Sequence, residues 1–213
     1  MSAREQILAR VRGAVADVTT PMGSRGPAPR VEQLSAGPAE TIDLFVDNVV
    51  DYRATVVRAP AGGVARAIGQ ALAAHAAGSV VVPSGVDPAW LGELPDGITV
   101  VADDGLGNAE LDAVDAVLTA SAVSIATTGT IVLDHGPDQG RRALSLVPDL
   151  HVCIVRAEQV VHDVPEAVAR LRPNGMARPL TWISGPSATS DIELDRVEGV
   201  HGPRTLSVVL VEG

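Results

Sequence analysis

The chain of 213 residues is 46% hydrophobic, which is enough to bury about 70% of its unfolded surface around a single core. Its formal net charge of -10 disfavours nonspecific binding to nucleic acid, because that binding depends on Lys and Arg neutralising phosphates. All 16 basic residues are arginine, so a lysine Schiff base and the lysine of a phosphate-binding P-loop are excluded.

Cofactor and membrane signals are absent from the sequence. The single cysteine, Cys153, excludes an internal disulfide and a cluster held by several thiolates, and the five histidines show no metal-ligand spacing. We therefore predict no metal site and no cofactor in this chain. No signal peptide is visible and the longest apolar stretch, 71–82, is too short to span a bilayer, so we expect a cytoplasmic protein with no membrane span.

The first predicted element is an amphipathic helix. Ser2 and Glu5 have the spacing of a capping box, and apolar residues follow at helical spacing from Ile7 to Val18. Residues 19–38 are rich in Pro, Gly and Ser, which indicates a linker, so we divide the chain into a helix and linker over 1–38 and an α/β domain over 39–213. The helix is rich in arginine, which suits docking on an acidic partner or simply a solvated helix face.

The domain itself begins with a helix over 39–52 and continues as short apolar strands separated by helices. Such strands predict a mainly parallel sheet with helices on both faces. The predicted strands are 55–57, 79–82, 98–101, 116–119, 151–155 and 205–211, and the predicted helices are 64–77, 88–94, 109–114, one from about 158, and 165–171.

Residues 124–133 read as two strands around a threonine-rich bend that contains Thr128, Gly129 and Thr130. At a strand end of a parallel sheet such a bend would lie on the ligand-binding edge. A plain turn, with the hydroxyls bonded to nearby backbone, is the alternative. Arg141 follows and would offer a bidentate fork to a carboxylate or phosphate, unless it forms a surface salt bridge.

A strand over 181–183 ends at a Gly-Pro turn and precedes a predicted helix start. Ser190 and Glu193 have capping-box spacing, and Asp191 lies in the first turn. Amides and hydroxyls just before a helix start suit an anion, and the residues placed there are Gly185, Ser187 and Thr189. A loop and helix cap without a ligand is the alternative.

A second glycine-rich turn, Gly199-Val200-His201-Gly202-Pro203-Arg204, follows closely. We predict that the two turns fold together into a pocket for a small anion, a carboxylate or a phosphate. In it Arg204 would clamp the anion and His201 would donate or accept a proton. A Ser187–His201–Asp191 triad has the right residue types, but Asp191 in a first helical turn more often compensates the helix dipole.

These turns, with Thr128-Gly129-Thr130, Arg141 and Pro148, resemble the lactate utilization protein C family, the small LUD-domain proteins. The chain departs from the family pattern at Thr127, where an acidic residue is usual, and at Ala188, where Arg is usual. The resemblance implies the fold of sugar-phosphate isomerases and CoA transferases. It also implies a component of an oxidoreductase system that oxidises L-lactate to pyruvate together with separate iron–sulfur subunits.

Two other functions remain open at this point. One is a stand-alone enzyme acting on a phosphorylated or acyl small molecule, with His201 essential for turnover. The other is a purely structural subunit that contacts iron–sulfur partners through its N-terminal helix and tolerates substitutions in the pocket.

Overall fold

The computed structural model describes residues 2–16, 37–171, 179–189, 197–199 and 201–213. The chain divides into two compact units, Met1–Ser35 and Ala36–Gly213. In the first unit, α1 (Ala3–Ala14) begins with the predicted capping box between Ser2 and Glu5, and it buries none of its residues. Its apolar side chains Ile7 and Val11 are more than half exposed.

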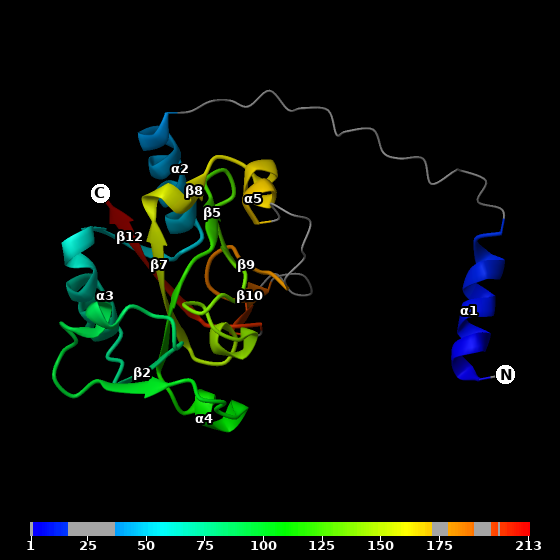
Figure 1. Ribbon diagram of the computed structural model, residues 1–213, viewed down its shortest axis with the longest axis horizontal. Helices are drawn as coiled ribbons and strands as arrows, with labels where there is room; N and C mark the ends of the chain where they lie inside the picture. Colours follow the sequence, from blue (N-terminus) through cyan, green and yellow to red (C-terminus); the bar gives the residue numbers. More distant parts are fainter. Residues whose placement is uncertain (1, 17–36, 172–178, 190–196, 200) are drawn as a thin grey trace. The chain divides into compact units, whose positions relative to one another are not determined.

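A six-stranded parallel sheet organises the second unit (Figure 1). The strand latest in the sequence, β12, lies between β1 and β7, where its apolar residues are buried on both faces. In spatial order the strands are β1 (Thr55–Pro60), β12 (Thr205–Glu212), β7 (Leu150–Arg156), β4 (Ala116–Ala120), β2 (Ser79–Val82) and β3 (Thr99–Ala102).

Helices cover this sheet on both faces, as predicted for an α/β fold. On one face α3 (Val64–Ala74) buries Ile68 and Leu72 against alternate residues of the strands. On the other face α2 (Pro38–Asp51) buries Phe45 and Val49. Shorter helical segments connect the strands: η1 (Ala61–Gly63), η2 (Pro88–Leu91), α4 (Asn108–Asp112), η3 (Arg142–Ser145) and η4 (Ala157–Gln159).

A smaller second sheet shares the face of α2 and was not predicted. Its order is β8-β5-β6-β9, and both pairs that involve β6 are antiparallel. Its inner residues Ile131 and Leu133 pack against Cys153 and Leu206 of the large sheet, and α5 covers its other side through Ala167. The elements are β5 (Val123–Ile125), β6 (Thr130–Leu133), β8 (Val160–Val161), α5 (Val164–Leu171) and β9 (Thr181–Ile183).

Two predicted elements need correction. The helix expected from about residue 158 is the single turn η4, which gives way to β8 because the β-branched pair Val160-Val161 joins the edge of β5. The threonine-rich bend joins two strands of the second sheet, so it does not lie on an edge of the parallel sheet. It lies instead against α2, where the Asn48 side chain donates a hydrogen bond of 2.8 Å to the Ala126 carbonyl.

Candidate functional site

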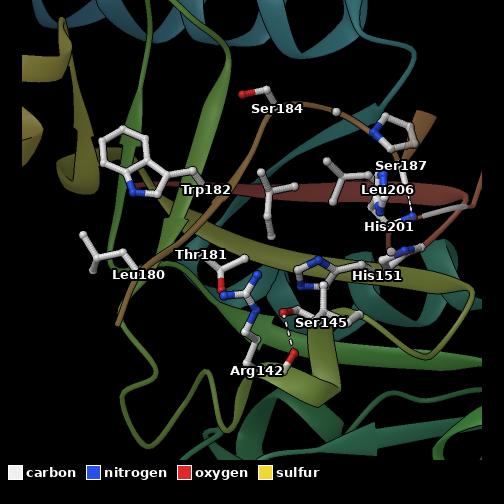
Figure 2. Close-up of a pocket in the computed structure, with 16 residues that line it drawn as sticks. Arg142, Ser145, His151, Leu180, Thr181, Trp182, Ser184, Ser187, His201 and Leu206 are labelled. Carbon is white, nitrogen blue, oxygen red and sulfur yellow. Dashed lines mark hydrogen bonds between the residues drawn. The ribbon is translucent and has the colours of Figure 1, made fainter. Parts of the chain in front are cut away.

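A cavity of about 310 Å³ opens where the second sheet meets the beginning of two strands of the large sheet (Figure 2). Its walls are η3, the segment from Leu180 to Ser187, and the turn from His201 to Pro203. Its floor includes His151 and Leu206, each near the amino end of its strand. Ligands of open α/β sheets usually bind at the carboxyl ends of the strands, so this cavity lies at the opposite edge.

Ser187 joins the two glycine-rich turns through three hydrogen bonds. Its amide donates to the Pro203 carbonyl at 2.8 Å, and its own carbonyl accepts from the Gly199 amide at 2.9 Å. Its hydroxyl accepts from the His201 amide at 2.9 Å. The turns therefore meet as the sequence suggested, with Gly185, Ser187 and His201 all on the cavity wall.

The two arginines predicted to clamp an anion are engaged elsewhere. Arg141 forms a fork on the Asp103 carboxylate at 2.9–3.1 Å and also donates to the Leu106 carbonyl, and the hydrogen bond to Asp103 raises the pKa of Arg141. Arg204 contacts both carboxylate oxygens of Asp149, at 2.6 and 2.8 Å. Neither arginine lines the cavity, so the surface salt bridge is the interpretation that the geometry supports for both.

The arginine that does line the cavity is Arg142, which sequence reasoning missed. Its guanidinium points into the cavity toward Thr181 (Figure 2), and it has no hydrogen-bond or salt-bridge partner among the residues that the structure describes. No aspartate or glutamate is among the described residues of the lining, although acidic residues outnumber basic ones by 26 to 16 in the chain. The cavity thus holds one positive charge that no acidic side chain in the described part of the chain neutralises.

Thr181 is fixed opposite this arginine by a histidine. His135 Nδ1 faces the Gly140 carbonyl at 3.0 Å, and since a carbonyl only accepts, this nitrogen carries the proton. Its Nε2 therefore accepts from the Thr181 hydroxyl, at 3.0 Å. The oxygen of Thr181 keeps its lone pairs, and Thr181 lines the cavity.

Two predicted site glycines serve the packing against α2. A Cβ on Gly185, at φ +82°, would lie 2.6 Å from the Cβ of Tyr52, and one on Gly129, at φ +55°, would lie 2.9 Å from the backbone of Asn48. Both positions need glycine because the backbone is left-handed and a helix lies against it. Gly185 still lines the cavity, and Gly129 does not.

Of the predicted threonines, Thr128 and Thr130 connect to the cavity wall through Ser184. Thr130 Oγ1 is 2.7 Å from Thr128 Oγ1 and 2.8 Å from the hydroxyl of Ser184, which is itself a lining residue. Thr189 lies in β10 (Ala188–Thr189), which pairs with β11 (Val197–Glu198). The predicted cap residues Ser190, Asp191 and Glu193 lie outside the described residues.

The floor residue His151 was also missed, because it begins an apolar run and looks like core. It is only 1% exposed, its Nε2 is 2.8 Å from the hydroxyl of Thr119, and that hydroxyl also reaches Cys153 Sγ at 3.7 Å. Burial lowers the pKa of His151 to about 4, so the imidazole is neutral near pH 7. The sequence signal for this pair was weak: His151 and Thr119 are polar residues that each adjoin an apolar run.

Neither a metal site nor a membrane-crossing helix is evident in the described part of the chain. No group of three or more His, Cys, Asp or Glu residues in that part is placed to hold a metal ion. Within the same residues, no helix has the length and apolar character needed to cross a bilayer.

Comparison with known proteins gives consistent matches. The LUD domain family model matches residues 96–211. A lactate utilization protein C from Deinococcus radiodurans is 50% identical over 179 residues, which is 81% of this chain and 80% of that protein. One from Bacillus subtilis is 37% identical over 99 residues, 44% of this chain and 41% of that protein. The crystal structure of a DUF162 family protein from Deinococcus radiodurans is 44% identical, with a TM-score of 0.69, and the match covers 84% of this chain and 100% of that one.

Proposed function

Because this chain belongs to the LUD domain family, we propose that it is a component of lactate utilisation that binds a small carboxylate in the cavity beside Arg142. The observation that carries the proposal is the Arg142 guanidinium in a cavity whose described lining has no acidic side chain. A guanidinium matches a carboxylate in geometry as well as in charge.

The two turns support this role by closing the cavity around the charge. Ser187 holds the turns together, and Ser145, Thr181 and Ser184 are among the residues that line the same space. A cavity of about 310 Å³ is at the small end of the range for ligand sites, which suits a molecule of a few heavy atoms.

The test compares two adjacent arginines. Calorimetric titration of the purified protein with lactate, pyruvate and inorganic phosphate is expected to show binding of the carboxylates. Arg142→Gln should weaken that binding at least tenfold, about the effect of removing one charged hydrogen-bonding partner. Arg141→Gln is the matched control, because its guanidinium is engaged by Asp103 outside the cavity, and it should leave binding nearly unchanged.

Two results would contradict the proposal. If the protein binds none of the three anions, with or without partner subunits, the proposed binding role is wrong. A preference for phosphate over both carboxylates would instead favour the alternative of an enzyme acting on a phosphorylated molecule, for which His201→Ala should abolish turnover.

We also propose that separate iron–sulfur subunits carry the electrons, since one cysteine cannot hold such a cluster. The exposed helix α1, with Arg4, Arg10 and Arg12 against Glu5, supports a contact with an acidic partner. Co-purification of cluster-containing proteins with residues 1–213, and its loss with residues 36–213, is the expected result. Equal recovery with both chains would place the contact elsewhere.

A further inference from the structure

β9 is the last strand of the second sheet, and one of its edges is open. In the order β8-β5-β6-β9, only β6 pairs with it among the residues that the structure describes. The cavity lies along this strand, since the segment 180–187 forms one of its walls (Figure 2). A strand edge without a neighbour presents N–H and C=O groups that can pair with another extended chain. This wall of the cavity is therefore also a template for strand pairing.

The hydrogen bonds of β6 show which groups of β9 face the open edge. In an antiparallel ladder the N–H and C=O of one residue point to the same side, and successive residues alternate. The carbonyl of Val132 accepts from the Ala122 amide, so Val132 points toward β5. Its neighbours in β6 therefore bond to Thr181 and Ile183, and the N–H and C=O of Trp182 point the other way, along the open edge. No loop or turn in the described part of the chain bonds to these two groups.

The two faces of β9 differ in chemistry. Figure 2 shows the Trp182 ring on one side of the strand and Thr181 on the other, with the Arg142 guanidinium on the Thr181 side. Trp182 is 42% exposed and Leu180 lies on the same side, so this face offers apolar surface. A strand added at the edge would alternate between the two faces in the same way. It would meet a positive charge on one face and an indole on the other.

We propose that the open edge of β9 binds an extended segment of a partner protein in which acidic and apolar side chains alternate. The segment adds as a fifth strand of the second sheet, and its backbone pairs with the N–H and C=O of Trp182. An acidic side chain lies on Arg142, which no acidic residue of the described lining neutralises, and an apolar side chain lies against the indole. This inference goes beyond the proposed function, because it gives the same guanidinium a macromolecular ligand as well as a small one.

A second copy of this chain does not supply such a segment from the edge strands of its two main sheets. Among these described strands, β1 carries one charged residue, the basic Arg58, and β3, β8 and β9 carry none. An arginine placed opposite Arg142 would repel it, and an uncharged strand would leave it unmatched. The partner is therefore another protein.

The experiment uses a blocked peptide of five residues, with valine at the centre, glutamate on either side of it and threonine at both ends. Paired with β9, its valine lies opposite Trp182 and both glutamates lie on the Arg142 face. NMR titration of the full chain is expected to show binding, with the Trp182 amide proton protected from exchange. Replacing both glutamates by glutamine should weaken binding at least about tenfold. Methylating the valine nitrogen should do the same, because it removes the hydrogen donated to the Trp182 carbonyl.

Position 182 offers a matched pair of variants. Trp182→Ala loses the indole and keeps the edge N–H, whereas Trp182→Pro loses both. Because this N–H points away from β6, proline leaves the bonds between β6 and β9 intact. Trp182→Ala should weaken peptide binding about fivefold, and Trp182→Pro should weaken it about tenfold further.

The two adjacent arginines test the charged contact. Arg142→Gln should bring the affinities of the glutamate and glutamine peptides to within about twofold of each other. Arg141→Gln should preserve the difference between the peptides, because Asp103 engages this guanidinium outside the cavity.

Three results would overturn the inference. Absence of peptide binding, or binding that methylation of the valine nitrogen does not weaken, would show that β9 takes no added strand. A dimer of the chain alone that the peptide dissociates, measured by light scattering, would identify a second copy as the occupant. None of these results decides the proposed function: lactate binding that Arg142→Gln weakens supports the small-carboxylate site even if the peptide does not bind, and peptide binding without lactate binding does the reverse.

Discussion

At the scale of single residues, His151 couples the cavity to the stability of the fold. Its pKa falls from an ordinary 6.5 to about 4 because burial disfavours the charged form. Between about pH 6.5 and pH 4 the imidazole of His151 is therefore protonated in the unfolded chain and neutral in the folded chain. For this reason the residue destabilises the fold progressively as pH falls through that range.

We predict that the free energy of unfolding falls by about 3 kcal/mol more in the wild type than in His151→Phe between about pH 7 and about pH 4. The comparison between the two proteins removes the contribution of the carboxylates, which titrate in both. Urea unfolding at a series of pH values measures it. Parallel pH profiles for the two proteins would show that this imidazole does not resist protonation.

Cys153 provides a second residue-scale prediction. Burial raises the pKa of its thiol to about 12, and the Thr119 hydroxyl donates to its sulfur. We expect the folded protein to resist thiol-modifying reagents and the urea-unfolded protein to react at once. Because the chain has one cysteine, the labelled fraction reports on this site alone. Rapid labelling under native conditions would mean that the sheet opens locally at β7.

The arginines show which features of the site could be predicted from the sequence and which could not. The sequence predicted Arg141 and Arg204 as the partners of an anion, and it offered no means of choosing between Arg141 and Arg142, which are adjacent and chemically identical. The choice between them depends on Asp103, which follows β3 and reaches Arg141 only in the folded chain. His151 was hidden for a similar reason, since its partner Thr119 lies 32 positions earlier on a neighbouring strand.

At the scale of elements, α2 is the surface that holds both site loops. Gly129 and Gly185, far apart in sequence, place their backbones against Asn48 and Tyr52 at the end of this one helix. The helix thus controls where the hairpin and the Ser184–Ser187 segment lie relative to each other.

We predict that Gly185→Ala destabilises the protein more than Gly97→Ala. Both glycines have a left-handed backbone, with φ of +82° and +92°, which costs any other residue about 1–2 kcal/mol. Only at Gly185 does the new methyl group meet another atom, the Cβ of Tyr52 at 2.6 Å, which adds about 1–3 kcal/mol of overpacking. Urea unfolding measures the loss of stability in each variant, and the difference between the two losses gives the cost of the steric clash with Tyr52. Equal losses would mean that Tyr52 moves aside freely.

The parallel sheet was predictable from the sequence because its strands are short apolar runs separated by helical segments, and local pattern is enough to recognise them. The second sheet was not, since β8 has two residues and β9 joins β6 across about fifty intervening residues. The location of the cavity was not predictable either, because β9 of this second sheet forms part of the cavity wall. The bend at Thr128 was expected at the edge of the parallel sheet because no local signal places its strands in a different one.

At the scale of the whole molecule, the two units have unequal roles in stability. No residue of α1 is buried, whereas the unit 36–213 holds the hydrophobic clusters around both sheets. We predict that residues 36–213 alone unfold cooperatively, with a free energy of unfolding within about 0.5 kcal/mol of the full chain. Chemical denaturation of both proteins measures this. A large loss of stability would show that residues 1–35 contribute to the core of the second unit.

The position of β12 bears on how the protein is made. During translation β1 is synthesised early and β7 about a hundred residues later. Both strands pair with β12, which is synthesised after them and lies between them in the sheet. At about 5–20 residues per second, roughly 7–30 seconds pass between the synthesis of β1 and that of β12, and during this time β1 cannot join its sheet. Chaperones that shield exposed strand edges would therefore matter most during that interval. A premature stop codon before Thr205 would leave β1 without the strand that links it to β7 and the rest of the sheet.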